Sequence, residues 1–366
     1  MNRTYAVDPD ITIAATIASA FYSDASAYAL ARERIFARTW QWIGELTDVK
    51  QPGSLSPRDM LPGYLDEPLL LARDQAGVLR CLSNVCTHRG NLLVKAPCRA
   101  EQIRCSYHSR RFDLSGRMTF MPEFELAKNF PSPADHLQRV AFGTVANHGF
   151  ACIDPIAPVD AFVGDVKARL GWLPLDQLRF NAARSRDYSV AAHWALYVEN
   201  YLEGFHIPFV HAGLNRLVDY GSYATEVYRY ATLQLALAKE GELAFDLPAA
   251  SPDYGRRVAA YYFWVFPNLM LNFYPWGLSL NLVQPQAIDR TRIAFHTYIW
   301  HEAKLDTGAG GTVHEVELED EEVVQAVQRG VRSRLYRNGR YSPTRERGVH
   351  RFHRLICEFM AEEARS

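Results

Sequence analysis

The chain has 366 residues, of which 48% are hydrophobic and 12% aromatic, so it can bury a sizeable core and is not a disordered protein. Its 40 Lys and Arg residues nearly balance 41 Asp and Glu residues, and this balance argues against a nucleic acid or an anionic membrane as partner. The sequence holds no apolar run of about 18 residues and no signal peptide after Met1, so we expect a cytoplasmic protein that does not cross a membrane.

In chain order, three regions of different texture follow one another. Residues 1–39 are predicted to be a helical segment, because Ala-rich stretches run from about residue 10 to residue 38. Residues 40–156 alternate short β-rich runs with Gly, Pro, Asn and Asp, which predicts a small β-rich domain. Residues 157–366 mix helices and strands, so we expect an α+β fold class. The helices predicted there are 194–205 and 317–336, and the strands are 261–266 and 291–300.

Two pairs of Cys and His lie in the β-rich region. Cys86 and His88 form the first pair, and Cys105 and His108 follow it with the overall spacing C-x-H-x16-C-x2-H. Zinc is one candidate for such a ligand set, but zinc fingers place like ligands together, whereas each loop here offers one thiolate and one imidazole. That arrangement favours a Rieske 2Fe–2S cluster, in which one iron takes both thiolates and the other takes both imidazoles.

A second metal site is predicted from the pattern E-x-x-H-x4-H at Glu203, His206 and His211. On a helix, Glu203 and His206 share one face. His211 is too far round a regular helix to converge with His206, and we expect Pro208 to end the helix so that His211 can turn back. Two imidazoles and a carboxylate make the ligand set of a non-haem Fe(II) oxygenase.

The remaining carboxylate is predicted to be Asp320. It continues an apolar stripe with Val324, Val327, Val331 and Leu335 on one helix, so it is the acid on the buried face. The neighbouring acids are expected to point away from the buried face of this helix: Glu319, Glu321 and Glu322. The alternative is that Asp320 merely interacts favourably with the start of the helix.

Aromatic and polar side chains alternate along a stretch that is predicted to line a substrate pocket. Such a wall binds a quaternary ammonium group by cation–π attraction or a flat ring by stacking, and it is equally typical of a plain core. The predicted pocket residues are Phe205, Trp264, Phe266, Asn268, Met270, Asn272 and Tyr274.

These motifs, in this order, resemble the catalytic α subunits of the Rieske non-haem iron oxygenases over nearly the whole chain. The segments Asn200–Glu203 and Phe266–Met270 look like the choline and carnitine monooxygenase branch. The resemblance implies a Rieske 2Fe–2S domain at 40–156, a catalytic helix-grip domain at 157–366 with an antiparallel sheet around a long helix, and an N-terminal segment packed on the catalytic domain.

The resemblance also implies site roles and partners. The chain would form a homotrimer in which Glu203 bridges His206 to the cluster ligand His108 of a neighbouring subunit and so conducts electrons, with Asn200 as a further catalytic residue. No dinucleotide-binding or phosphate-binding motif is found, so electrons from NAD(P)H are expected to arrive through a separate flavin and iron–sulfur reductase or a ferredoxin.

The function implied is the oxidation of a small amine or quaternary ammonium substrate by O2, through hydroxylation, N-demethylation or N-oxygenation. Monooxygenation is favoured over dioxygenation. One alternative is a ring-hydroxylating oxygenase of an aromatic compound. Another is a non-catalytic Rieske electron-transfer protein, which the second motif at Glu203, His206 and His211 argues against.

Overall fold

The computed structural model describes residues 4–311 and 313–361, and the chain divides into two compact units. The smaller unit is Ala37–Ile156, and the larger unit joins Met1–Phe36 to Ala157–Ser366. The N-terminal segment belongs with the C-terminal half because its backbone pairs there. The N–H of Ser19 donates to the carbonyl oxygen of Arg337 at 2.7 Å, and Ala15 forms an isolated bridge with Arg340.

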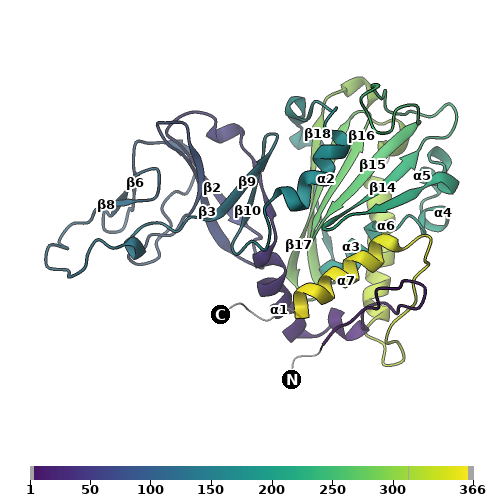
Figure 1. Cartoon of the computed structure of the whole chain (residues 1–366), viewed down its shortest axis with the longest axis horizontal. Helices are drawn as coiled ribbons and strands as arrows, with labels where there is room; N and C mark the ends of the chain where they lie inside the picture. Colours follow the sequence, from purple (N-terminus) through teal and green to yellow (C-terminus); the bar gives the residue numbers. More distant parts are fainter. Residues whose placement is uncertain (1–3, 312, 362–366) are drawn as a thin grey trace. The chain divides into compact units, whose positions relative to one another are not determined.

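The smaller unit is built from three antiparallel sheets (Figure 1). The first has the order β1 (Gln41–Glu45), β10 (His148–Cys152), β9 (Ala141–Val145). The second has the order β4 (Leu79–Ser83), β3 (Glu67–Arg73), β2 (Ser54–Met60), β5 (Cys98–Arg99). The third has the order β6 (Ile103–Arg104), β7 (Arg111–Phe112), β8 (Met118–Phe120).

Strand β3 separates two hydrophobic cores of the smaller unit. Its side chains alternate, so Leu69 and Leu71 pack into one core while Leu70 and Ala72 pack into the other. The second of these cores also contains the sulfur-bearing side chains of Cys86 and Cys105. The β-sheets therefore hold both Cys–His loops against one packed layer.

The larger unit contains one eight-stranded antiparallel sheet. Its strands follow the order β11 (Arg179–Phe180), β18 (Arg290–Ile299), β17 (Gly277–Ala287), β16 (Leu269–Tyr274), β15 (Val258–Val265), β14 (Ala231–Leu237), β13 (Ala224–Val227). Strand β12 (Arg186–Val190) also pairs with β18. The aromatic and β-branched residues of β15 are buried along its whole length, as a central strand covered on both faces requires.

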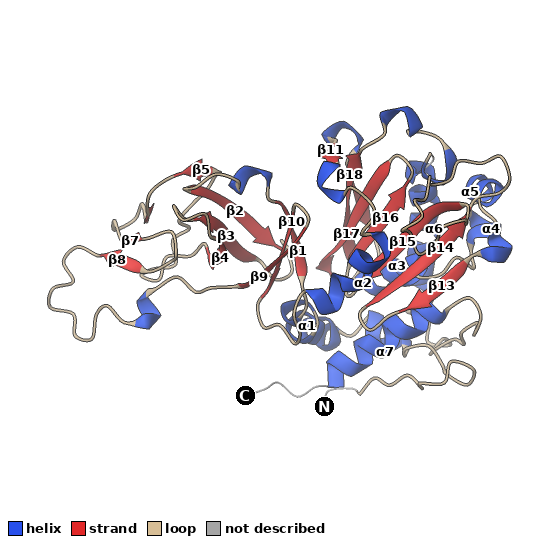
Figure 2. Ribbon diagram, turned by 45° about the horizontal axis from the view of Figure 1, so that its top comes forward, coloured by secondary structure: helices blue, strands red, loops and turns tan. Residues whose placement is uncertain are grey.

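Helices cover both faces of this sheet, as Figure 2 shows by colour. The pleat of β15 points Tyr261 towards Asp253, which pairs with Arg169 of α2, and points Trp264 towards Phe352 of α7. Helix α3 packs on β17, and α6 packs against α3. The α-helices are α1 (Ala25–Arg34), α2 (Asp160–Leu170), α3 (Trp194–Tyr201), α4 (Ile207–Val210), α5 (Ala212–Leu217), α6 (Val313–Gly330) and α7 (Arg347–Ala361).

The α+β fold class is confirmed, but the predicted helix in the N-terminal segment is much shorter than expected. From residue 4 onwards, where the structure describes this segment, the only helices are α1 and short 3-10 turns, and residues 11–18 are not helical. The carboxylate of Asp10 accepts hydrogen bonds from the N–H and hydroxyl of Thr12, and Thr16 pairs with Gly339. These local and long-range bonds replace the helical ones.

Candidate metal centres and substrate cavity

The two Cys–His loops of the smaller unit bring their side chains together. Cys86 and Cys105 are each only 2% exposed, and the rings of His88 and His108 stand edge to face with centroids 4.8 Å apart. Each loop is closed by a backbone bond, from Gly90 to Cys86 and from Ser109 to Cys105. The closed loops therefore present one thiol and one imidazole each to a shared position.

The electrostatic environments of the two thiols differ, because burial raises the pKa of Cys86 while the pKa of Cys105 is lowered. Burial alone would raise the pKa of Cys105, but the N–H groups of Tyr107 and His108 bring it below its usual range and favour the thiolate. Burial, with His108 and Arg110 close by, lowers the pKa of His88, which favours the neutral ring that a metal ligand requires. His88 Nδ1 is buried with no hydrogen-bond partner among the described residues. Two thiols and two imidazoles, one of which has a ring nitrogen without a partner in the described structure, suit a Rieske cluster.

The second set of predicted ligands sits on a short broken segment of the larger unit. Helix α3 ends at Tyr201, so Glu203 and His206 do not share a helix as predicted. The prediction that Pro208 ends a helix was wrong as well, because Pro208 lies in the first turn of α4, where a missing N–H costs nothing. His206 precedes α4 and His211 follows it, so one short helix sets the spacing of the two imidazoles.

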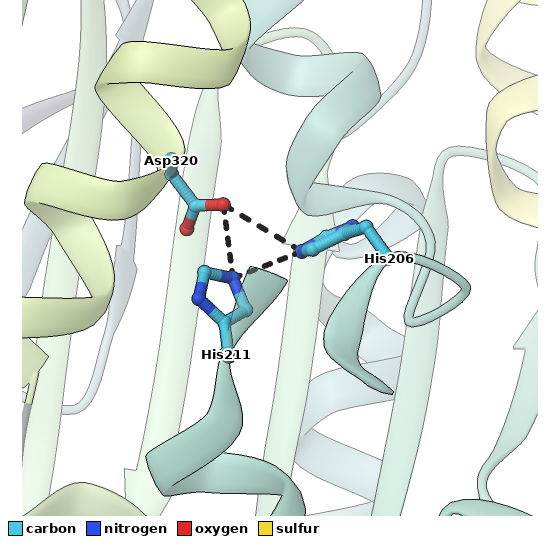
Figure 3. Close-up of side chains that lie close together, drawn as sticks. All are labelled: His206, His211 and Asp320. Carbon is cyan, nitrogen blue, oxygen red and sulfur yellow. Dashed lines mark hydrogen bonds and ion pairs between the residues drawn. The ribbon is translucent and has the colours of Figure 1, made fainter. Parts of the chain in front are cut away.

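Three atoms converge at this place, as Figure 3 shows. His206 Nε2 and His211 Nε2 are 3.1 Å apart, and Asp320 Oδ1 of α6 lies 3.0 Å from His211 Nε2 and 3.5 Å from His206 Nε2. Ligand atoms about 2.1 Å from an ion and at right angles to one another are separated by about 3.0 Å. The His206, His211 and Asp320 side chains therefore fit one face of a mononuclear metal centre.

Both imidazoles are held from behind by carboxylates. Glu203 Oε1 lies 2.6 Å from His206 Nδ1, and Glu319 Oε2 lies 2.7 Å from His211 Nδ1. These contacts place the proton on each Nδ1 and leave each Nε2 lone pair for a metal. The prediction that Glu319 points away from the site was therefore wrong. Glu319 and Asp320 are consecutive residues of α6, and their carboxylates contact the two different nitrogens of the His211 ring.

The buried face of α6 also differs from the predicted stripe. Val324 and Val331 are buried, but Val327 is 42% exposed and Leu335, beyond the helix, is 97% exposed. Glu317, one turn before Asp320, is only 4% exposed. Its Oε2 accepts a hydrogen bond from the Tyr197 hydroxyl at 2.5 Å, and burial, more than the nearby acids, raises its pKa well above the usual range.

A cavity opens beside the three converging atoms, with His206, His211 and Asp320 in its wall. Its empty volume is about 730 Å³, including the part open to solvent, which is in the range of small-molecule sites. Among the described residues that line it there is no lysine or arginine. The polar lining consists mainly of phenols, amides and acids: Tyr197, Tyr201, Tyr223, Tyr262, Tyr274, Asn200, Gln234, Asn272, Asn281, Glu203 and Glu317.

Only some of the residues that were predicted to line a substrate pocket line this cavity. Asn272 and Tyr274 line it, as does Asn200. The others lie elsewhere, which corrects the prediction for Phe205, Trp264, Phe266, Asn268 and Met270. The alternation along β15 and β16 does describe one face of the sheet, but α7 covers the far end of that face.

Each of the displaced residues has its own setting. The rings of Trp264 and Phe266 pack on Phe352 of α7. The Asn268 amide donates to the carbonyl oxygen of Val283, Met270 is fully buried in the sheet, and Phe205 is 42% exposed. Strand periodicity identifies a face, but it does not show where along that face a covering helix stops.

Sequence reasoning missed the lining contributed by Tyr197, Tyr201, Tyr223 and Glu317. A signal existed for some of them. Tyr197 and Tyr201 are four residues apart on α3, and Glu317 precedes Asp320 by three, so each pair shares a helix face. Tyr223 lies in an irregular segment, where the sequence carries no periodicity that points to a site.

Comparison with known proteins agrees with this construction. Residues 175–362 match the family described as ring hydroxylating alpha subunit (catalytic domain), and residues 39–131 match the Rieske [2Fe-2S] domain. The chloroplastic choline monooxygenase of Arabidopsis thaliana is 28% identical, over 95% of this chain and 84% of its own length. The carnitine monooxygenase oxygenase subunit of Escherichia coli K12 is 28% identical, over 94% of this chain and 93% of its own.

A solved structure shows the same fold. The quaternary ammonium Rieske monooxygenase CntA in complex with L-carnitine matches with a TM-score of 0.74 at 23% identity, covering 96% of this chain and 97% of its own. Together, the two domains and the second ligand set define a Rieske non-haem iron oxygenase.

The chain belongs to the family of ring hydroxylating alpha subunits, since the match to that catalytic domain covers more than half of its 366 residues. The predicted family resemblance is thereby confirmed, as is the combination of a Rieske domain with an α+β catalytic domain. In the described part of the chain, each helix is too short or too polar to cross a membrane.

Proposed function

We propose that this chain is the oxygenase component of a monooxygenase that oxidises a small amine or quaternary ammonium compound with O2. The observation that carries the proposal is the convergence of His206, His211 and Asp320 at the wall of a cavity that is rich in phenols and acids and has no basic lining residue. Such a lining attracts a cation and offers nothing to a free anion.

The named relatives support this substrate class. One is a choline monooxygenase, another is the oxygenase subunit of a carnitine monooxygenase, and the CntA structure holds L-carnitine. Both compounds, choline and carnitine, carry a quaternary ammonium group. At 28% identity with each of the two enzymes, the comparison supports the substrate class.

Each group of site residues has a distinct proposed role. Cys86, His88, Cys105 and His108 would hold the 2Fe–2S cluster, and His206, His211 and Asp320 would hold the mononuclear iron. When bound, the cluster supplies single electrons and the mononuclear iron activates O2. The carboxylates of Glu203 and Glu319 orient the two imidazoles. Asn200 lies in the cavity wall, where its amide can hydrogen-bond to substrate.

Electron delivery is proposed to use a cytoplasmic homotrimer and a separate reductase or ferredoxin that draws on NAD(P)H. Glu203 accepts bonds from His206 Nδ1 and from the N–H groups of Phe205 and His206, so one of about four acceptor positions of its carboxylate is left for His108 of a neighbouring subunit. Phe205 and Phe209 beside it are 42% and 79% exposed, as apolar side chains at a subunit contact would be in one isolated chain.

The test is a single turnover of chemically reduced protein with isotope-labelled O2. The substrate pool contains choline, carnitine, betaines, simple amines and several aromatic acids, and products are read by mass spectrometry. We expect one labelled oxygen atom in an amine-derived product, or an aldehyde released with loss of a methyl group, and the other oxygen in water. Label found only in ring products, with two atoms in one product, would overturn the proposal in favour of ring hydroxylation.

A matched pair of variants separates the two metal sites. Asp320→Ala should retain the visible spectrum of the cluster but give no labelled product. Cys86→Ala should lose the cluster and fail to turn over with its reductase. Turnover by either variant at the wild-type rate would contradict the assignment of ligands.

A further inference from the structure

Glu317 is a buried acid in the cavity wall that the metal centre does not use. It lies on α6, one turn before Asp320, and is only 4% exposed. The other carboxylates at this place already have roles, since Asp320 faces the two Nε2 atoms and Glu203 and Glu319 hold the Nδ1 atoms. Glu317 lines the same cavity but contacts neither of the two imidazoles.

Within residues 4–311 and 313–361, only one of its two oxygen atoms has a hydrogen-bond partner. Oε2 accepts the hydrogen bond of the Tyr197 hydroxyl at 2.5 Å. Oε1 is shielded from solvent and has no hydrogen-bond partner among the described residues. Leaving a buried carboxyl oxygen without a partner is costly, and a protein that retains one needs a compensating group. Burial by itself raises the pKa of Glu317 and favours the uncharged acid, whereas an ammonium group in the cavity would favour loss of the proton and the charged carboxylate.

The surroundings of Glu317 suit a cation with apolar substituents. The phenol hydroxyls of the cavity are largely committed to protein acceptors, since Tyr201 donates to Asn272 at 2.8 Å and Tyr223 donates to Gln234 at 3.3 Å. Burial raises the pKa of Tyr201 and Tyr223 well above the usual range, so the rings remain neutral. Their aromatic faces can therefore pack on methyl groups that surround a positive nitrogen.

We infer that Glu317 is the specificity-determining residue for the charged end of the substrate: its carboxylate neutralises an ammonium nitrogen, and Tyr197 fixes the orientation of the carboxylate. This inference rests on the proposed function and narrows it to cationic substrates that are held by charge and not by shape alone. No bond to the substrate forms or breaks at Glu317, so it contributes to binding and not to the oxidation.

The test compares Glu317→Gln with wild type on a panel of cations and one neutral analogue. The compounds with a cationic nitrogen, called cations below, are choline, carnitine, glycine betaine and trimethylammonium; carnitine and glycine betaine also carry a carboxylate. The neutral analogue is the carbon isostere of choline, in which a tert-butyl group replaces the trimethylammonium group. Gln keeps the length of the side chain and an acceptor for the Tyr197 hydroxyl, so the variant removes charge with little change of shape. Glu322→Gln, at an exposed position of the same helix, is the matched control.

For each cation that wild type oxidises, we expect Glu317→Gln to raise KM by about tenfold or more, with a much smaller change in kcat. Binding of the neutral isostere should be unchanged or improved in Glu317→Gln, and Glu322→Gln should resemble wild type. The melting temperature and iron content of each variant show that the fold and both metal sites are retained. If Glu317→Gln does not fold, Glu317→Asp serves instead, with a smaller rise in KM for the same cations.

The possible results separate this inference from the proposed function. Cations oxidised with the same KM by wild type and Glu317→Gln would overturn the role of Glu317 and leave the proposed function standing. An equal loss of affinity for the cations and the neutral isostere would show a role in shape only and would also overturn it. If wild type oxidises none of the cations, the proposed function fails, and the inference fails with it.

Discussion

Removing the charge of Glu319 should weaken iron binding at the mononuclear site without touching a ligand. Glu319 Oε2 lies 2.7 Å from His211 Nδ1, and Glu203 Oε1 lies 2.6 Å from His206 Nδ1. Loss of such a partner typically lowers metal affinity by about 10- to 100-fold. The Glu319 side chain is 44% exposed and that of Glu203 is 15% exposed, so water can replace Glu319 more readily. We therefore expect about a tenfold loss for Glu319→Gln, near 1.4 kcal/mol, and a larger loss for Glu203→Gln.

The assay is competition with a chelator for the mononuclear iron, on protein whose cluster is monitored by its visible spectrum. Glu322→Gln controls for the loss of one negative charge from α6, because this exposed residue removes the same charge without contacting either imidazole. Equal iron affinity in Glu319→Gln and wild type would refute the reasoning. So would equal losses in Glu319→Gln and Glu203→Gln, since the argument assigns the difference to exposure.

Three further outcomes follow from single positions. Asp320→Ala should lower the iron content from about three to about two per chain while the cluster spectrum remains, and loss of all iron would contradict two independent sites. Gly348→Ala should lower the free energy of unfolding by about 1–3 kcal/mol, because its Cβ would lie 2.5 Å from the carbonyl oxygen of Leu202, just before Glu203. The melting temperature and the turnover rate should both fall; unchanged values would show that the backbone shifts here without cost. His193 is fully buried with its pKa lowered to about 3 by desolvation, so stability is lost as pH falls below 6.5, by about 2 kcal/mol near pH 5. His193→Asn should flatten the fall of the urea midpoint between about pH 7 and pH 5, and parallel curves would contradict this account.

Local patterns carried much of the prediction. Cys86 with His88, and Cys105 with His108, lie within one turn of chain each, so their spacing alone indicates which side chains can approach one ion. Helical periodicity singled out Asp320 within an acidic run, although the stripe used for that argument was partly wrong: Val327 and Leu335 are exposed. Asp320 was still correctly placed beside the two imidazoles because one helical turn contains few acidic residues that could face them.

Where local rules failed, a neighbour far along the chain or a polar side chain decided the structure. Residues 11–18 have helical composition, yet Ala15 pairs with Arg340 and no helix forms. Pro208 was expected to end a helix, but Glu203 had already turned the chain by accepting the N–H groups of Phe205 and His206, and Pro208 begins the next helix. Side-chain hydrogen bonds of this kind compete with the helix and leave little trace in periodicity.

The sequence by itself determined the fold class, the two sets of candidate ligands and the family resemblance, because each depends on residue type and short spacing. Only the tertiary structure decided which residues form the cavity. Helix α7 covers Trp264 and Phe266, while the end of the same sheet face that carries Tyr262 and Tyr274 stays open beside the metal ligands. It also decided that Glu317 is buried and that one of its oxygens has no partner in the part of the chain that the structure describes, since burial depends on elements that meet across more than a hundred residues of chain.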